Sequence, residues 1–516
     1  MKRAFHSWIP PKLDLWLLLL LSTILSFTNG IPTTLATYIL SDQAGIPADM
    51  TMASYAYYTG MACAIPLVFR MSSFTSKRNL LIGVHLSLLF LNFILAHTTV
   101  SLSVVMACFG VGFIKIFGSV GLLGELMPLL MHKGERYEMY CVYYPLAILV
   151  PALSGIVAIY IADSFHWEVS FHFQNFLLFI GLLIVILFMH SNDRDKRIPL
   201  YQYDWLGSIL LSAALLVIAY TTTYGLTENW FHSYHIIIGA VASVGLILLF
   251  LHRNLRVRKP LFRFEVFKLR ALPITIGTLF FLGIFYSSSS LISSFNSIIV
   301  PGYPVKSAEI SNYYVMGGYI VGSIFTYQYF KRTKDCRFIF AFSCLCYLIC
   351  NVWLYLLVSP QTAPVQLAAP LFFRGMGLMV SYITAGVYLG GNVPVKAFLP
   401  CVAFLIFVRS YLVPIVWSNI LANWYYHRQL INLNHLAGGM DKIDPLVLSR
   451  GTGIARTVQT QASMLAVRDI LGALNVVGLV LLVVIFLFPY HSSRIRRIFN
   501  WRDSARSKEM AQALPV

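Results

Sequence analysis

Long apolar runs separated by short polar segments follow one another along most of this chain. An α-helix needs about 20 mainly apolar residues to cross the hydrocarbon core of a bilayer. Fourteen runs approach or exceed this length, and together they predict an all-α polytopic membrane protein with fourteen transmembrane helices. We place them at 16–40, 51–70, 79–97, 102–130, 137–161, 169–190, 205–225, 232–252, 271–298, 308–330, 337–358, 364–390, 398–424 and 467–488.

Two short patterns occur twice in the same order and at nearly the same spacing. Phe109-Gly110-Val111-Gly112 is followed by Leu149-Val150-Pro151, and Arg374-Gly375-Met376-Gly377 by Leu412-Val413-Pro414. Internal repeats in hydrophobic chains are typical of transporters built from related halves. We therefore predict two six-helix bundles at 1–200 and 261–516, with an inserted helix pair at 201–260. Superposition of the halves should place Gly110 on Gly375 and Pro151 on Pro414.

The composition excludes a soluble protein. The chain is 58% hydrophobic and only 11% charged, with a mean hydropathy of +0.73, whereas soluble domains carry about 25% charged residues. The net charge of +18 has its source in the loops. The eight cysteines show no paired metal-ligand spacing, so we expect no metal site.

The basic residues predict the orientation. Most of the 38 Lys and Arg fall in alternate loops and at the two ends of the chain. Because loops rich in Lys and Arg stay on the cytoplasmic side, both termini are predicted to be cytoplasmic. The first run resembles a signal peptide, but we keep it as a span because its removal would leave an odd number of spans.

One extra-cytoplasmic segment, 425–466, is unusually long. Its last part, from Gly453 to Leu465, mixes polar and apolar residues. An amphipathic helix leading into the last span and a disordered loop are both compatible with this composition.

Four charged residues lie well inside predicted spans: Lys115, Glu125, Arg374 and Arg409. Charges within a membrane are costly and usually mark a transport pathway or a buried partner. Glu125 lies near the end of its span, so its side chain could instead reach the membrane interface. Arg409 could bond to helix carbonyls near Pro414. Lys115 could instead face lipid.

Lys115 and Arg374 have no evident carboxylate partner at mid-span. An unpaired buried cation either loses its proton or stays in contact with water. We expect a water-filled, positively charged central cavity, in which Arg374 is a fixed charge and Lys115 can titrate. Tyrosines at 55, 57, 58, 140, 143 and 144 offer amphipathic aromatic surface, and we select Tyr55, Tyr58 and Tyr144 as candidate pocket residues. Helix packing explains the tyrosines equally well.

Several motifs resemble the fourteen-span drug:H⁺ antiporter family of the major facilitator superfamily, and the resemblance covers nearly the whole chain. They are Arg136 fifteen residues before Pro151, Ile161-Ala162-Asp163 before His166-Trp167, Asp204-Trp205-Leu206-Gly207, Arg374-Gly375, and Arg409 before Pro414. The resemblance implies a major facilitator fold, with Pro151 and Gly155 in the antiporter motif of the fifth span. From the repeated patterns and the motif residues we select Pro151, Gly155, Pro414, Gly110, Gly375 and Arg136 as candidate helix-break or gating residues, and we expect Pro151 to break its helix midway.

The sequence departs from this family at the positions that carry coupling. Asn29 and Gly30 stand near the place of the acidic residue of the first span, and Phe109 occupies the slot of the fourth-span arginine. The fold therefore carries over more safely than the coupling mechanism or the drug substrate.

The function predicted from these features is secondary active transport by alternating access, with proton-coupled efflux of amphipathic organic compounds or drugs. The alternative is an organic-anion carrier with a positively charged cavity. HExxH, GxSxG and Walker motifs and paired acids at a span end do not occur in the sequence, so we expect no enzyme and no cofactor. The resemblance implies the inner membrane, and a periplasmic adaptor and an outer-membrane channel as partners.

Overall fold

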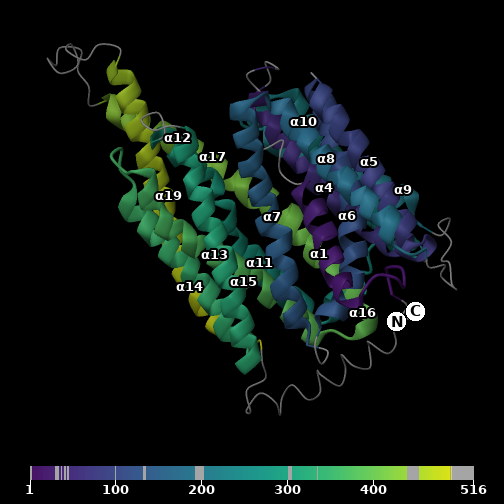
Figure 1. The fold of residues 1–516 in the computed structure, drawn as a ribbon. Coiled ribbons are helices and arrows are strands. Elements are labelled where there is room, and N and C mark those ends of the chain that lie inside the picture. Colours follow the sequence, from purple (N-terminus) through teal and green to yellow (C-terminus); the bar gives the residue numbers. More distant parts are fainter. Residues whose placement is uncertain are drawn as a thin grey trace. The chain divides into compact units, whose positions relative to one another are not determined.

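The computed structural model describes most of the chain as α-helices joined by short connections (Figure 1). The described residues are 3–28, 34–35, 38–39, 42, 46–98, 100–131, 135–191, 203–257, 259–299, 305–333, 335–438, 453–487 and 490. Within them, one isolated bridge between Phe5 and Met189 is the extent of β-structure. The predicted all-α fold is confirmed. Parts of the predicted first span and of the 425–466 segment, and the predicted cytoplasmic tail beyond 490, lie outside these residues.

The helices form two compact units. Unit 1 comprises residues 1–269 together with 395–411. Its helices are α1 (Pro11–Phe27), α4 (Pro47–Phe74), α5 (Lys77–His97), α6 (Ser101–Leu130), α7 (Arg136–Ser164), α8 (Trp167–Phe188), α9 (Trp205–Tyr224), α10 (Tyr234–Arg256) and α16 (Val395–Phe407), with short 3₁₀ turns at Trp230–His232 and Phe264–Lys268.

Unit 2 comprises residues 270–394 and 412–516. Its helices are α11 (Ala271–Ser287), α12 (Ser289–Ile299), α13 (Val305–Arg332), α14 (Cys336–Leu357), α15 (Ala368–Asn392), α17 (Val413–Gly438) and α19 (Gly453–Leu487), with a 3₁₀ turn at Pro364–Leu367. A π-helical segment, Val408–Leu412, connects α16 to α17.

The same helix pairs pack in each unit. In unit 1, α6 packs on α1, α4 and α5, and α8 packs on α5 and α7. In unit 2, α15 packs on α11, α13 and α14, and α19 packs on α14 and α17. Helices α9 and α10 pack on one another, and α9 also packs on α4. The exact boundaries of the predicted halves stay a prediction.

Glycines allow α4 and α6 to cross at backbone contact in unit 1. A Cβ atom built on Gly60 of α4 would lie 2.2 Å from the backbone oxygen of Phe109, and one built on Gly112 of α6 would lie 2.0 Å from that of Tyr57. Real Cβ atoms essentially never approach within 3.0 Å. Any larger residue at either position would separate the two helices.

Unit 2 contains the matching crossing of α13 and α15. A Cβ atom on Gly318 would lie 2.1 Å from the backbone oxygen of Phe372, and one on Gly375 would lie 2.1 Å from that of Val315. In both units the glycine and the contacted residue on the same helix are three positions apart. The two crossings are therefore built in the same way.

The crossings correct the predicted register of the repeat. A Cβ atom on Gly110 would meet the side chain of Leu91 at 3.2 Å, on a different face of α6 from the crossing. Gly112 is thus the contact equivalent of Gly375, and the predicted Gly110–Gly375 match is displaced by two residues. Sequence spacing alone could not identify which of the two glycines faces α4.

The two prolines of the predicted repeat do not have the same local structure. Pro151 was expected to break its helix, but α7 continues through it to Ser164. Pro414, in contrast, is the second residue of α17 and lies two residues after the end of the π-helical segment. A proline removes one backbone hydrogen bond and crowds the carbonyl four residues earlier, and a helix can respond by a local change of pitch or by a small bend.

Eleven helices among the described residues are long and apolar enough to cross a membrane. The remaining three predicted spans coincide with α1, α4 and α13, which are helical but do not meet that length and hydropathy standard in their described parts. The chain is a multi-pass membrane protein. The number fourteen and the orientation of the termini stay predictions.

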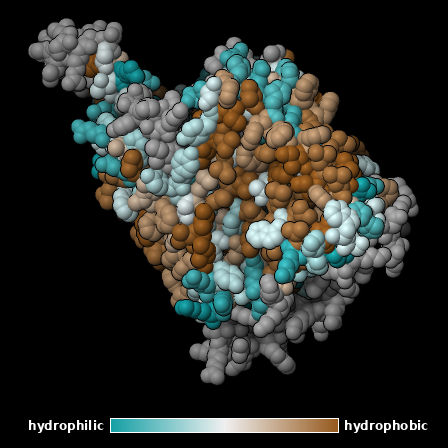
Figure 2. Space-filling view, viewed as in Figure 1, coloured by the Kyte–Doolittle hydropathy of each residue, from teal (hydrophilic) through white to brown (hydrophobic). Residues whose placement is uncertain are grey.

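Large apolar side chains cover much of the outer surface. Along α10, for example, Ile238, Val241, Val244 and Leu248 are each more than half exposed. Figure 2 shows a broad hydrophobic face with hydrophilic residues gathered near its upper and lower margins. A surface of this kind matches a protein that is solvated by lipid along its helices.

The two helices at the 425–466 segment, α17 and α19, are longer than predicted. Helix α19 begins at Gly453 and runs to Leu487 without interruption, so the helical interpretation of 453–465 is confirmed. Helix α17 also extends to Gly438, beyond the predicted end of its span. A hydrogen bond of 2.8 Å from Gln429 to Ser463 joins the two extensions.

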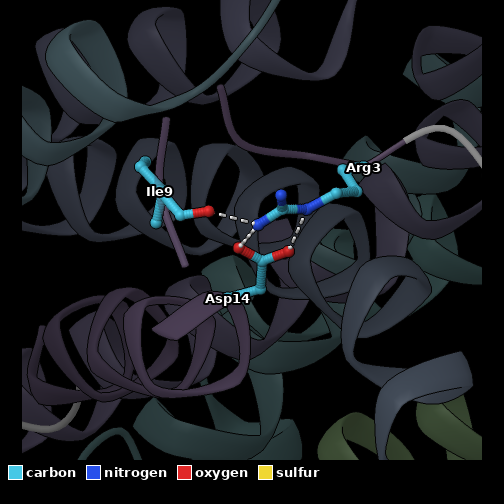
Figure 3. Close-up of polar contacts among 3 residues, drawn as sticks. All are labelled: Arg3, Ile9 and Asp14. Atoms are coloured by element: carbon cyan, nitrogen blue, oxygen red, sulfur yellow. Dashed lines mark hydrogen bonds and ion pairs between the residues drawn. The ribbon is translucent and has the colours of Figure 1, made fainter. Parts of the chain in front are cut away.

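The N-terminal segment is held against the start of α1 (Figure 3). Arg3 donates hydrogen bonds to both carboxylate oxygens of Asp14, at 3.0 and 2.9 Å, and to the carbonyl of Ile9 at 2.7 Å. The hydrogen bond to Asp14 raises the pKa of Arg3 above its usual value. Because α1 also packs on α6, α7 and α8, it is an integral part of unit 1.

Candidate functional site

Two of the predicted pathway residues, Tyr144 and Arg409, meet at the π-helical segment. The guanidinium of Arg409 lies over the ring of Tyr144 at 5.2 Å, and the guanidinium of Arg136 lies over Phe398 at 4.4 Å. Tyr140 stacks on Tyr144, with ring centroids 5.5 Å apart. We call this group of residues the α7–α16 seam. It consists of Arg136, Tyr140 and Tyr144 of α7, Phe398 of α16 and Arg409 of the π-helical segment.

The π-helical segment places Arg409 at the seam. Pro414 has no amide hydrogen, so the carbonyl of Ser410 loses its ordinary helical partner. A π-helical turn accommodates such a defect, and π-turns occur frequently at functional sites. Tyr411, in the same segment, donates a hydrogen bond of 2.6 Å to the carbonyl of Leu215 on α9. Arg409 and Tyr411 are thus anchored on two different helices of unit 1.

The other two candidate tyrosines lie on α4. Tyr55 is buried, and its carbonyl accepts a hydrogen bond of 2.7 Å from Thr59. Tyr58 is half-buried and contacts the ring of Tyr57 edge-on, with centroids 5.5 Å apart. These contacts are compatible with packing and with a pocket, so their role stays a prediction.

Glu125 is paired near the end of its helix. Its carboxylate forms an ion pair with Lys77, the first residue of α5, and both side chains are partly exposed. This contact favours the interpretation in which Glu125 stabilises a helix end. The sequence does not identify Lys77 as the partner of Glu125, because the two residues lie on different helices.

Lys115 and Arg374 bond to backbone carbonyls. The ammonium of Lys115, 3% exposed, donates to the carbonyl of Ser26 on α1 at 3.4 Å. The Nη2 atom of Arg374 donates to the carbonyl of Tyr286 on α11 at 2.6 Å, and its Nε is buried without a hydrogen-bond partner among the described residues. These acceptors could not be predicted from residue types, because both are backbone carbonyls and not polar side chains.

The helix-break candidates have separate surroundings. Pro151 accepts a hydrogen bond of 2.8 Å from Ser154 at its carbonyl. A Cβ atom on Gly155 would lie 2.9 Å from the hydroxyl oxygen of Thr34, so this glycine permits close packing beside α7.

An ion-paired helix start was also missed as a structural feature. Asp204 accepts a hydrogen bond of 3.0 Å from the backbone of Gly207 and caps α9. The same carboxylate forms an ion pair of 2.8 Å with Arg253 of α10. The Asp-Trp-Leu-Gly motif therefore joins the two helices of the predicted inserted pair.

A groove of about 380 Å³ lies on α5 and α6 of unit 1, away from the seam. Its lining includes Phe90, Leu91, Phe109, Gly110 and Phe113, and Phe90 is 65% exposed. An apolar, outward-facing groove of this kind suits a lipid chain. Among the described residues, no group of His, Cys, Asp and Glu could hold a metal ion.

The sequence of this chain is similar to the sequences of multidrug export proteins. No family model matches the chain. It is 21% identical over 338 residues to a multidrug export protein EmrB of Haemophilus influenzae, covering 64% of each chain, and 21% identical over 328 residues to the EmrB of Escherichia coli K12, covering 62% of each. The chain thus spans less than two thirds of the length of these relatives.

Solved structures resemble almost the whole chain. A POT family transporter in complex with 5-aminolevulinic acid has a TM-score of 0.59 at 14% identity, covering 95% of this chain and 98% of that one. A peptide transporter POT in complex with sulfate has a TM-score of 0.54 at 14% identity, covering 91% and 94%. At such low identity the likeness concerns the fold alone. The chain therefore shares its all-helical fold with these transporters.

Proposed function

We propose that the protein is a secondary transporter that exports amphipathic organic compounds by alternating access. The observation that carries this proposal is the repetition of the same helix pairs in units 1 and 2. Carriers are commonly built from repeated helical halves, whereas a channel or a membrane enzyme has no need of them. The similarity to multidrug export proteins supports export as the direction.

The α7–α16 seam supplies a surface suited to such compounds. Stacked tyrosines present large apolar faces together with hydroxyl groups, and Arg409 adds a fixed charge beside them. Aromatic surfaces with a few polar groups bind bulky, partly polar ligands without demanding one shape. We assign Tyr144 and Arg409 to the substrate pathway.

A second candidate function is the transport of organic anions. Within the described spans Lys115, Arg374 and Arg409 introduce positive charge. The carboxylates of Asp14, Glu125 and Asp204 are each paired with a basic side chain: Arg3, Lys77 and Arg253. The balance of charge inside the membrane therefore favours anionic over cationic substrates.

Proton coupling and the partners belong to the same proposal. The protein would use a proton gradient across the inner membrane. An adaptor protein and an outer-membrane channel are expected only from the resemblance to drug antiporters in double-membrane bacteria.

The test is dye accumulation in inverted membrane vesicles that contain the protein. Three dyes of similar size, one anionic, one neutral and one cationic, are offered with a proton gradient and after its collapse by a protonophore. Gradient-dependent accumulation supports the proposal, and accumulation of the anionic dye alone favours the second candidate. If none of the dyes accumulates above vesicles without the protein, the export proposal is wrong.

A further inference from the structure

Helices α1 and α11 end in the same way. Each is 17 residues long, and each is the first long helix of its predicted half. The residue after α1 is Thr28, whose hydroxyl donates to the carbonyl of Leu25 at 2.7 Å. The residue after α11 is Ser288, whose hydroxyl donates to the carbonyl of Phe285 at 2.6 Å. Hydroxyl groups that bond to the preceding turn compete with the helical pattern and favour its end.

A cation from the equivalent helix reaches each of these ends. The carbonyl that Lys115 contacts belongs to Ser26, the last residue but one of α1. The carbonyl that Arg374 contacts belongs to Tyr286, the last residue but one of α11. Lys115 comes from α6 and Arg374 from α15, the two helices that carry the matched glycine crossings.

The position of the cations follows from helix electrostatics. The last four carbonyls of a helix have no partner within it, and they carry the negative end of the helix dipole. In a membrane an unsatisfied carbonyl costs several kcal/mol, because water is absent from the hydrocarbon core. The carbonyl of Tyr286 also accepts from the backbone N–H of Ser288. A cationic donor adds a charged hydrogen bond at each helix end and interacts favourably with the negative end of the helix dipole. At the end of α1, Gln174 adds a hydrogen bond of 3.0 Å to the carbonyl of Phe27.

When α6 and α15 are aligned on their crossing glycines, Lys115 and Arg374 lie one helical turn apart. If Gly112 is aligned with Gly375, Arg374 precedes its glycine by one residue and Lys115 follows its glycine by three. Positions four apart lie on the same face of a helix. The two units therefore present a cation from the same face of an equivalent helix, although neighbouring turns supply it.

We propose that Lys115 and Arg374 are positioning residues that hold the ends of α1 and α11, and that transport requires these bonds to the carbonyls rather than the direct binding of substrate by the two charges. This inference rests on the proposed transport function. It replaces the expectation that Arg374 binds an anionic substrate and that Lys115 titrates in a cavity.

Cysteine labelling tests the local part of the proposal. Ser26 and Ser288 are 8% and 1% exposed. Ser26→Cys is combined with Lys115→Met or Lys115→Arg, and Ser288→Cys with Arg374→Met or Arg374→Lys. Labelling by a membrane-permeant maleimide is read on the cysteine-bearing peptide by mass spectrometry, so the eight buried native cysteines do not interfere.

The methionine variants remove the donor but keep an unbranched side chain. We expect them to label about tenfold faster than their parents, as the loss of a hydrogen bond to a charged donor predicts. The arginine and lysine replacements keep a cationic donor and should label at nearly the parental rate. Arg78 provides the matched control, because it bonds to the carbonyl of Ile186 at 2.8 Å near the end of α8, and Arg78→Met should not change labelling of Ser26→Cys.

Transport of matched anionic and neutral dyes separates positioning from substrate binding. We expect Arg374→Met and Lys115→Met to lose both dyes to the same extent, with recovery in the cationic replacements. Unchanged labelling in the methionine variants, or loss of the anionic dye alone, would overturn the proposal. If the parent protein transports no dye, the transport function fails, whereas the labelling still reports on the helix ends.

Discussion

Replacing Gly112 by alanine should destabilise the protein, although the same replacement at Gly110 should not. Both glycines lie inside α6, so each alanine gains about 0.5–1 kcal/mol from its better helix propensity. At Gly112 the new methyl group would lie 2.0 Å from the backbone oxygen of Tyr57, and the helices must separate until this distance is at least 3.0 Å. At Gly110 it would meet the flexible side chain of Leu91 at 3.2 Å, which needs a shift of only a few tenths of an ångström.

Overpacking of a close contact costs about 1–3 kcal/mol, and backbone cannot rotate away as a side chain can. We therefore expect Gly112→Ala to lower the free energy of unfolding by about 1–2 kcal/mol net, and Gly110→Ala to leave it unchanged or slightly raised. The measurement is thermal unfolding of the purified variants in detergent, followed by tryptophan fluorescence. Gly375→Ala should behave like Gly112→Ala, since its methyl group would lie 2.1 Å from the backbone oxygen of Val315. Equal melting temperatures for Gly110→Ala and Gly112→Ala would refute the assigned crossing.

Three further predictions concern orientation, the seam and the paired carboxylate. A cysteine at the exposed Phe231 should react with an impermeant maleimide in intact cells, whereas one at Ser76 should be protected; the reverse pattern would invert the predicted orientation. Arg409→Lys should reduce dye transport severalfold without loss of folded protein, since lysine lacks the planar guanidinium that lies over an aromatic ring; wild-type rates would exclude a role for that geometry. Glu125→Gln should lower stability by about 0.2–1 kcal/mol, as expected for a partly exposed pair with Lys77, and should leave the pH profile of transport unchanged; a shifted profile would assign Glu125 to the proton pathway.

Eleven of the spans could be predicted because their signal is local. A run of apolar residues of sufficient length needs no tertiary information to be recognised as a membrane helix. The same logic fails at the polar extensions of α17 and α19, where helix continues past the apolar run. There the hydrogen bond between Gln429 and Ser463 joins residues that are far apart in sequence.

At the candidate site, the charged residues could be predicted from the sequence but their contacts could not. Charge and position identified Lys115, Arg374 and Arg409 as residues that need a partner in the membrane. Their contacts could not be foreseen, because two bond to backbone carbonyls of distant helices and one lies over a tyrosine ring. Every residue has a backbone carbonyl, so the residue type does not show which carbonyl accepts a hydrogen bond. The hydroxyl residues that end α1 and α11 are also common elsewhere in spans.

The choice between Gly110 and Gly112 has the same origin. Two glycines two residues apart point to different faces of a helix. Only the neighbouring helix determines which face needs a small residue, so a repeat recognised from letters alone carries an uncertainty of a few positions.

The most direct test of the account is transport by the purified protein in proteoliposomes. A fluorescent amphipathic dye is supplied outside vesicles that carry an imposed pH gradient, with protein-free liposomes prepared in parallel. The account predicts dye accumulation that needs both the protein and the gradient and that stops when a protonophore is added. Accumulation equal to that of protein-free liposomes would contradict it.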